Sequence, residues 1–142
     1  MKIEYNHFLK KGLNNMKQII STTKAPAAIG PYNQGTSFEK LAFLSGQIPL
    51  NPETMEIVEG GIKEQTKQVM ENLKEVLESA NSSYENVLKT TCYLSDMDNF
   101  VAFNEVYSQY FETENAPARA TVAVKTLPKN VLVEVDAIAF KN

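Results

Sequence analysis

The sequence predicts an α+β domain in which helices cover one face of a sheet. Apolar side chains in residues 62–80 recur with the helical period and leave the charged residues on the other side, as in a helix packed on a core. Residues 131–140 alternate with a period of two, which is typical of a strand. A length of 142 residues allows one domain with a substantial core and is too short for two.

The first half of the chain predicts short strands joined by irregular loops. Residues 18–21 predict a first strand, and the prolines and glycine of residues 22–32 predict an irregular path. The apolar run 41–45 predicts a strand that opens into a loop around Gly46, since two prolines follow and exclude a helix. Residues 55–58 predict one further short strand.

The second half predicts a strand, a helix and two more strands. Residues 87–95 are rich in β-branched and aromatic residues and predict a strand, with Cys92 as a small buried residue. An aspartate at position 96 or 98 is expected to cap a helix that continues to about residue 111. After Pro117, residues 120–125 and 131–140 predict two strands that pair as a hairpin.

Neither face of the last predicted strand suits water. One face carries Val131, Val133, Val135, Ala137 and Ala139, and the other carries Leu132, Glu134, Asp136, Ile138 and Phe140. If the helices cover the first face, the large apolar residues of the second remain exposed in a monomer. We therefore expect another copy of the chain to cover them in a closed homo-oligomer.

Composition excludes several classes of function. The net charge of −3 and the lack of a basic block argue against a nucleic-acid partner. One histidine and one cysteine cannot supply the four ligands of a zinc site, and the single cysteine, Cys92, excludes an intrachain disulfide. His7 lies in a segment expected outside the domain, so Ser-His and Cys-His nucleophile pairs are not expected. No apolar run is long enough to span a membrane and no glycine-rich loop suggests a nucleotide cofactor, so we expect a cytoplasmic protein without metal or cofactor.

Residues 1–15 are expected to lie outside the domain, which spans residues 16–142. They have no clear period and lack the apolar region of a signal peptide, and Met16 resembles a second start. Lys11 and Gly12 can be encoded by a purine run that binds ribosomes, so the extension is interpreted as translated leader or as a disordered or peripheral segment.

Arg119 and Glu134 are the candidate functional pair. Arg119 is the only arginine, and its planar fork holds a carboxylate or phosphate through two hydrogen bonds, although a surface salt bridge is the alternative. Glu134 is either a general base on a partly buried face or half of a structural ion pair. Adjacent strands of one hairpin would bring Arg119 and Glu134 together. Asp136 is expected to have a structural role, and Ser45 is expected to position other groups.

Six short motifs, in order and spacing, resemble one family. They are Gly30-Pro31-Tyr32, Ser45-Gly46-Gln47-Ile48-Pro49, Lys89-Thr90-Thr91, Pro117-Ala118-Arg119, Leu127-Pro128-Lys129, and Glu134-Val135 with Ala137-Ile138-Ala139. Together they resemble the RidA branch of the reactive intermediate deaminase (Rid) family across residues 16–141, and nothing in the resemblance covers residues 1–15.

The resemblance implies both an architecture and a reaction. The architecture is a chorismate-mutase-like ββαβαββ chain with a mixed sheet and two helices on one face, assembled as a homotrimer with a central barrel and sites between subunits. The reaction is the hydrolysis of 2-imino acids, such as 2-iminopropionate and 2-iminobutyrate released by pyridoxal-phosphate dehydratases, to 2-keto acids and ammonia.

The resemblance also implies residue roles. Arg119 would hold the substrate carboxylate and Glu134 would direct the attacking water. Because an imine carbon is already electrophilic, correct orientation of the substrate and the water is sufficient for the reaction. The pocket would be lined or supported by Tyr32, Ser45, Gly46, Asn104 and Thr121. Many relatives carry cysteine at the position of Thr121, so no thiol chemistry is expected there.

Two alternatives stay open beside the enzyme. The same cleft would serve a non-catalytic module that binds or senses a small carboxylate, because a fold does not fix a function. A ribonuclease-like inhibition of translation has been attached to the family, but the acidic charge, the single arginine and the missing histidine pair argue against it.

Overall fold

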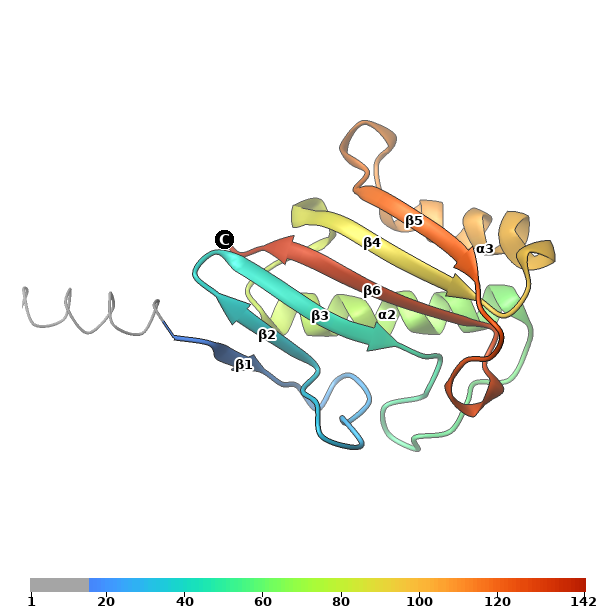
Figure 1. Cartoon of the computed structure of the whole chain (residues 1–142), viewed down its shortest axis with the longest axis horizontal. Helices are drawn as coiled ribbons and strands as arrows, with labels where there is room; N and C mark the ends of the chain where they lie inside the picture. Colours follow the sequence, from blue (N-terminus) through green and yellow to red (C-terminus); the bar gives the residue numbers. More distant parts are fainter. Residues whose placement is uncertain (1–15) are drawn as a thin grey trace, which may run out of the picture.

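The computed structural model describes residues 16–142, which form one six-stranded sheet with two helices (Figure 1). The strands are β1 (Gln18–Ile20), β2 (Gly35–Phe38), β3 (Leu41–Gln47), β4 (Val87–Leu94), β5 (Ala118–Ala123) and β6 (Val133–Phe140). The helices are α2 (Ile62–Ser79) and α3 (Phe100–Tyr107), and short 3-10 turns flank α3 on both sides. The predictions for residues 1–15 and His7 concern a segment outside the described residues.

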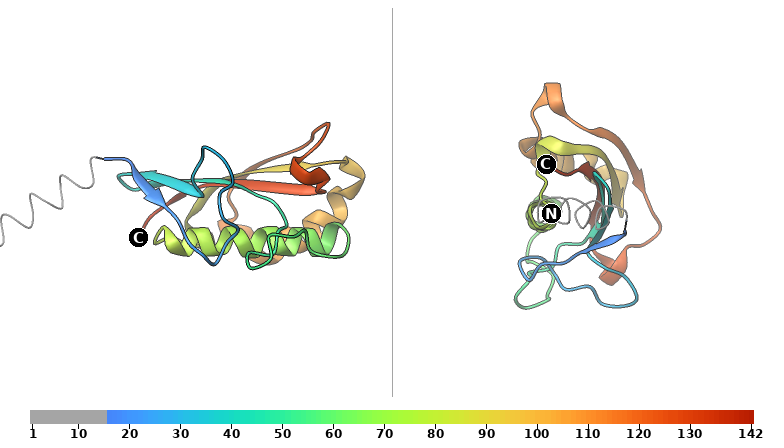
Figure 2. Two further views of the ribbon diagram at one scale, coloured as in Figure 1. Left: turned by 90° about the horizontal axis from the view of Figure 1, so that it is seen from below. Right: turned by 90° about the vertical axis from the view of Figure 1, so that its left-hand side faces the viewer.

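The sheet is mixed, as predicted. Its strand order is β1-β2-β3-β6-β4-β5, and every pair is antiparallel except β4 and β5, which run parallel. Both helices lie on the same face of the sheet, and the sheet curves around them (Figure 2). Strand β6 therefore lies in the middle of the sheet, and β5 forms one edge.

The core lies between the sheet and α2. The fully buried side chains of α2 include Val69, Met70, Leu73, Val76 and Leu77. Burial of each such side chain contributes about 1.5–3 kcal/mol to folding. On β6, buried residues alternate with half-buried ones from Val133 onward, and Cys92 of β4 is fully buried, so both sequence predictions are confirmed.

Carboxylate side chains accept hydrogen bonds from backbone N–H groups at the start of α2 and in the turn before α3. The backbone N–H of Gly61 donates to the Glu64 carboxylate at 2.8 Å, which satisfies a free donor at the start of α2. Asp96 accepts a hydrogen bond from the N–H of Asp98 at 2.8 Å and caps the 3-10 turn that leads into α3. Within residues 16–142, no helix combines the length and the apolar character needed to cross a bilayer.

Two predictions about strands are wrong, and one strand was not predicted. Residues 55–58 form only an isolated bridge from Ile57 to Leu50, because no neighbouring strand is available to extend the pairing. Strand β2 was not predicted, since its sequence GTSF is short and mostly polar. Strand β3 continues through a bulge to Gln47, so Gly46 lies within the strand's last residues and not in a loop.

The predicted hairpin of the last two strands is also wrong. Both edges of β6 are occupied, by β3 on one side and by β4 on the other, so β5 pairs with the far side of β4. The chain between Ala123 and Val133 passes the end of β4 to connect the two strands. Arg119 and Glu134 are therefore not on neighbouring strands.

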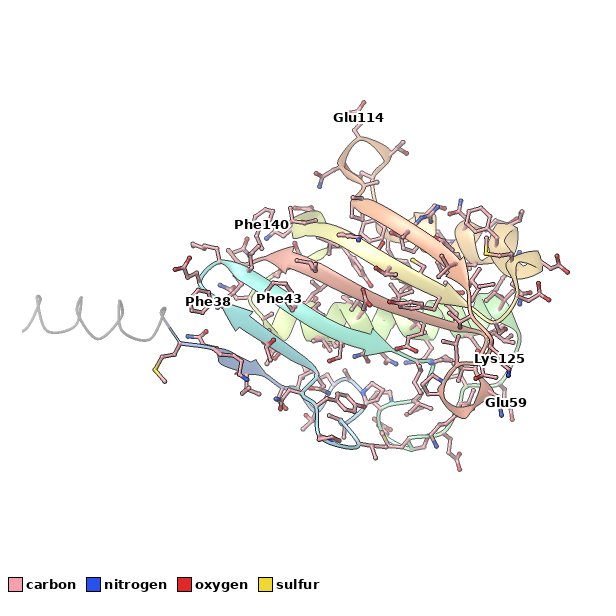
Figure 3. The ribbon with its side chains drawn as sticks, viewed as in Figure 1. Phe38, Phe43, Glu59, Glu114, Lys125 and Phe140 are labelled. Carbon is pink, nitrogen blue, oxygen red and sulfur yellow. The ribbon has the colours of Figure 1, made fainter. Side chains whose placement is uncertain are left out.

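The face of the sheet away from the helices carries exposed apolar side chains, here called the outer face. Figure 3 shows Phe38, Phe43 and Phe140 near one end of the strands, and 46% of Phe43 is exposed. Leu41 pairs with Phe140 and Phe43 pairs with Ile138, so these residues form one continuous surface. The prediction that the helices leave an apolar face uncovered in the single chain is confirmed.

Candidate active site

Arg119 is held on the side of the sheet that faces the helices. It pairs with Thr90 of β4, and its Nη1 donates to Oδ1 of Asn104 in α3 at 2.7 Å. The guanidinium carbon lies 4.8 Å from the ring centre of Tyr107 and 5.6 Å from that of Phe100. A cation stacked on aromatic rings and bound through one nitrogen keeps its other N–H groups for a ligand.

Helical spacing builds the platform beneath Arg119. Phe100, Asn104 and Tyr107 are four and three residues apart, so they lie on one side of α3. The Tyr107 hydroxyl and the Thr90 hydroxyl form a buried hydrogen bond of 2.7 Å, which fixes the ring. Burial raises the pKa of Tyr107 to about 12, so this hydroxyl is neutral at physiological pH.

Sequence reasoning assigned these aromatic residues to the core and missed their contact with Arg119. The available signal was the position of Asn104, the one polar residue among them, at the spacing that shares their helix face. Asn104 itself was predicted as a site residue, and the structure places it directly against Arg119.

Thr121 lies two residues beyond Arg119 and next to Cys92 of β4. Its hydroxyl oxygen is buried and has no hydrogen-bond partner among the described residues. Burial raises the pKa of the neighbouring Cys92 thiol to about 11, so this cysteine is not a thiolate at neutral pH. We call Asn104, Arg119 and Thr121 the Arg119 half-site.

A second group of predicted residues surrounds Glu134 on the outer face. A Cβ atom at Gly46 would overlap with the carboxylate oxygen Oε1 of Glu134, so glycine is required for this close approach. The Ser45 hydroxyl donates to the carbonyl of Asn33 at 2.5 Å and thereby holds the loop that carries Tyr32. We call Tyr32, Ser45, Gly46 and Glu134 the Glu134 half-site.

Tyr32 folds back over its own loop. Its hydroxyl accepts a hydrogen bond from the N–H of Ile29 at 3.2 Å, and its own N–H donates to the carbonyl of Gly30 at 2.9 Å. Gly30 has a φ of 124°, which residues other than glycine rarely adopt. About half of the Tyr32 side chain is exposed, so the ring is available to a ligand.

The Glu134 carboxylate is poised to accept a proton. Partial burial raises its pKa, and the charge of Asp136 on the same face raises it further. Asp136 accepts a hydrogen bond from the Tyr93 hydroxyl at 3.2 Å, which supports the structural role predicted for it. A carboxylate with a raised pKa, and with no cation beside it among residues 16–142 of the same copy, suits a general base.

The two half-sites do not meet within one chain. Arg119 is paired with the fully buried Thr90 and therefore points toward the helices, whereas Glu134 lies between the buried Val133 and Val135 and points away from them. The register places them two strands and three residues apart, which is roughly 14 Å between backbones. They face opposite sides of the sheet, so a single substrate cannot contact both in the same copy.

The structure has a cavity next to the Glu134 half-site. It has a volume of about 230 Å³, and Tyr32 and Gly46 are part of its lining. A larger hollow of about 820 Å³ lies beside Tyr84 and Tyr110, and it contains none of the predicted site residues. The smaller cavity is therefore the one connected with the candidate chemistry.

Comparison with known proteins identifies the family. Residues 22–141 match the family described as Endoribonuclease L-PSP. RidA of an Antarctic Psychrobacter species is 42% identical and superposes with a TM-score of 0.83, covering 87% of this chain and 98% of that one. The chain belongs to the Rid family. Its α+β fold is thus shared with solved Rid structures.

Some relatives are named only by family, and others are named by a reaction. A RutC family protein of Pyrococcus abyssi is 54% identical over 125 residues, which is 88% of this chain and 98% of the relative. The 2-iminobutanoate/2-iminopropanoate deaminase of mouse is 45% identical over 126 residues, 89% of this chain and 93% of the relative. TdcF of E. coli, whose structure contains bound serine, is 40% identical with a TM-score of 0.82 over 88% of this chain and 99% of that one.

Proposed function

We propose that this Rid protein hydrolyses 2-imino acids to 2-keto acids and ammonia in sites that two copies of the chain build together. The proposal rests on one observation: the guanidinium of Arg119 and the carboxylate of Glu134 lie on opposite faces of one sheet. Each half-site lacks the chemistry of the other, so a second copy is needed to complete it. The mouse relative named as a deaminase of these substrates supports the choice of reaction.

Arg119 would hold the substrate through its carboxylate. Asn104 and the aromatic platform fix one nitrogen and one face of the guanidinium, and a carboxylate takes the remaining N–H groups in a bidentate pair. The bound serine of the E. coli relative is a small amino acid with the same carboxylate group, which is consistent with a ligand of this class. Arg119 would fix the plane of the substrate carboxylate and would also attract its negative charge.

Glu134 would activate the attacking water. The water oxygen adds to the imine carbon while the carboxylate takes a proton from the water, and the imine nitrogen gains a proton to give an amino alcohol. Loss of ammonia from that intermediate, with the hydroxyl proton removed, gives the 2-keto acid. Overall one water is consumed and one ammonia is released, so neither a redox partner nor a metal is required by the balance.

The assembly we propose is a homotrimer with a central barrel. Strand β5 is an exposed edge strand that carries Arg119, and the outer face of the sheet carries the uncovered apolar residues around Phe43. Packing the β5 edge of one copy beside the outer face of the next buries that surface and brings Arg119 toward the neighbour's Glu134. Light scattering tests this assembly, and a stable monomer with full activity contradicts it.

The alternative is a module that senses a small carboxylate without turning it over. Both functions would use Arg119, but only the enzyme needs Glu134 to accept a proton. The family description names an endoribonuclease, yet the net charge of −3 and the single arginine argue against an RNA partner. We therefore favour a small-molecule substrate over a nucleic acid.

The test is a deaminase assay on wild type and Arg119→Lys. A threonine dehydratase generates 2-iminobutanoate, and the rate of keto acid release is compared with and without the protein. Lysine keeps the charge but loses one charge-assisted hydrogen bond, so we expect activity to fall about tenfold to a hundredfold. Lys67→Arg, on the exposed side of α2, is the matched control and should retain full activity.

The outcomes separate catalyst from sensor. Equal rates for wild type and Arg119→Lys contradict the carboxylate clamp. A wild type that binds 2-ketobutyrate in an Arg119-dependent manner but never accelerates imine hydrolysis establishes the sensor instead.

A further inference from the structure

We propose that the larger hollow, beside Tyr84 and Tyr110, is a binding site for aliphatic diamines and oligoamines, with carboxylates around an aromatic wall. Its volume of about 820 Å³ lies within the roughly 300–1,000 Å³ of pockets that hold small organic ligands. It contains none of the residues assigned to imine hydrolysis, so this second site does not depend on the proposed function. We call it the Tyr84 hollow.

Three segments of the chain surround the Tyr84 hollow. The C-terminal half of α2 contributes Lys74 and Glu78, the turn before β4 contributes residues 83–85, and the segment between α3 and β5, orange in Figure 1, contributes residues 109–112 and Asn115. The Asn115 side-chain amide donates to the carbonyl of Glu85 at 3.1 Å and so ties two of these segments together. The hollow is therefore preformed by contacts within the chain.

Aromatic rings form one wall of the Tyr84 hollow. The ring centre of Tyr84 lies 5.4 Å from that of Tyr110 and 5.0 Å from that of Phe111, which it meets edge to face. The Tyr84 hydroxyl donates to the carbonyl of Met70 at 2.5 Å, and the Tyr110 hydroxyl donates to the Glu71 carboxylate at 2.8 Å. Because both hydroxyls are bonded to α2, the rings offer the hollow apolar surface and π-electrons, which attract methylene groups and organic cations.

Negative charge dominates the rest of the lining. Three residues carry exposed carboxylates: Glu78, Glu85 and Glu112. Lys74 is the one basic residue of the lining. Among residues 16–142, only Lys63 and Glu105 form a salt bridge, so none of the three carboxylates has an ion-pair partner in this part of the chain. The hollow therefore favours a cation and disfavours an anionic imino acid.

The end of α2 adds to this negative potential. Glu78 lies in the last turn of the helix, where free carbonyl groups carry partial negative charge and a basic residue is usually favourable. The last turn of α2 contains no basic residue. An ammonium group bound beside Glu78 would compensate both the carboxylate and the helix end.

The spacing of the carboxylates indicates the kind of cation. No group of three Asp, Glu, His or Cys residues in the described part of the chain is placed to hold a metal ion. The carboxylates of the hollow come from three separate segments, so positive charges that pair with them must also be separated. Two or more ammonium groups joined by methylene chains meet this requirement, because the methylenes can pack on the aromatic wall while the ammonium groups reach the carboxylates.

Calorimetric titration of the full chain with 1,4-diaminobutane and with spermidine tests the proposal. We expect saturable binding of both amines at low ionic strength and weaker binding as salt is added, since the carboxylates are exposed. Butylamine has one ammonium group and should bind about threefold more weakly or worse. Succinate, with a carboxylate at each end of a short chain, should not bind.

Substitutions locate the site. Combining Glu78→Gln with Glu112→Gln removes two carboxylates of the hollow and should weaken spermidine binding about fivefold or more. Phe111→Leu removes one aromatic face and should weaken it about twofold to fivefold. Glu114→Gln is the matched control, because Glu114 is exposed in the same segment as Glu112, lies outside the lining and is drawn at the tip of its loop in Figure 3. It should retain the wild-type affinity.

Three results would overturn the inference. The absence of saturable binding of both amines removes the site. An equal loss of affinity in Glu114→Gln and in the Glu78→Gln, Glu112→Gln double variant assigns the binding to net charge and not to the hollow. Butylamine that binds as tightly as 1,4-diaminobutane removes the requirement for two separated charges.

Imine hydrolysis is measured on the same samples to keep the two sites apart. The Glu78→Gln, Glu112→Gln variant should hydrolyse imines at the wild-type rate, and Arg119→Lys should bind spermidine with the wild-type affinity. Loss of amine binding would therefore leave the proposed function standing. Weakened spermidine binding in Arg119→Lys would contradict two independent sites.

Discussion

Mixing two inactive variants tests whether the site is shared between subunits. Arg119→Lys removes the fork and Glu134→Gln removes the base, so each variant alone should have little activity. In a closed ring, each site takes Arg119 from one copy and Glu134 from its neighbour. A random equal mixture gives both intact groups to about one site in four, so activity should recover to about one quarter of wild type.

The assay unfolds the two variants together in denaturant, refolds them and measures imine hydrolysis against separately refolded samples. A mixture of Arg119→Lys with the double variant is the control, because no copy then supplies the arginine and activity should stay at background. No recovery in the first mixture, with assembly confirmed by light scattering, would refute the shared site. Recovery above one half would also contradict random pairing of one arginine with one glutamate.

Three further substitutions test single contacts. Asp136→Asn removes a charge that raises the pKa of Glu134, so the pH below which kcat/KM falls should move lower; movement to higher pH would contradict the base role. Gly46→Ala should displace the Glu134 carboxylate and lower kcat about a hundredfold with assembly intact, whereas normal kcat would show that this placement is unimportant. Tyr107→Phe loses the hydrogen bond to Thr90 and should cost about 1 kcal/mol in urea unfolding while KM rises more than kcat falls. Unchanged KM would leave that hydroxyl pair with a structural role only.

The parts of the fold with strong periodicity were predictable. Residues 62–80 gave α2 within one residue, and the alternation in residues 131–140 identified both faces of β6. Strand β2 was missed because its four residues carry no apolar alternation, and its pairing with β3 is decided by tertiary contacts. The local hydrophobic pattern identifies a helix or strand when that element buries one face. It says less about which strands pair with one another.

Strand pairing explains what could be predicted about the site. Motif resemblance led to Arg119, Glu134 and their neighbours, and the structure groups these residues into two half-sites. It could not place them relative to one another, because the predicted hairpin made β5 and β6 neighbours, whereas β4 lies between them in the structure. The parallel pairing of β5 with β4 points Arg119 toward α3, and no feature of residues 118–123 alone indicates that choice.

In the proposed assembly, the position of Arg119 on an edge strand would connect assembly to catalysis. An exposed edge strand and an apolar outer face are both liabilities for a monomer, because each invites non-specific association. One contact between copies would cover both and would also place the arginine of one chain near the glutamate of the next. Any change that weakens this contact should then remove activity without touching a site residue. The same contact that keeps the apolar face from water would thus define where the substrate can bind.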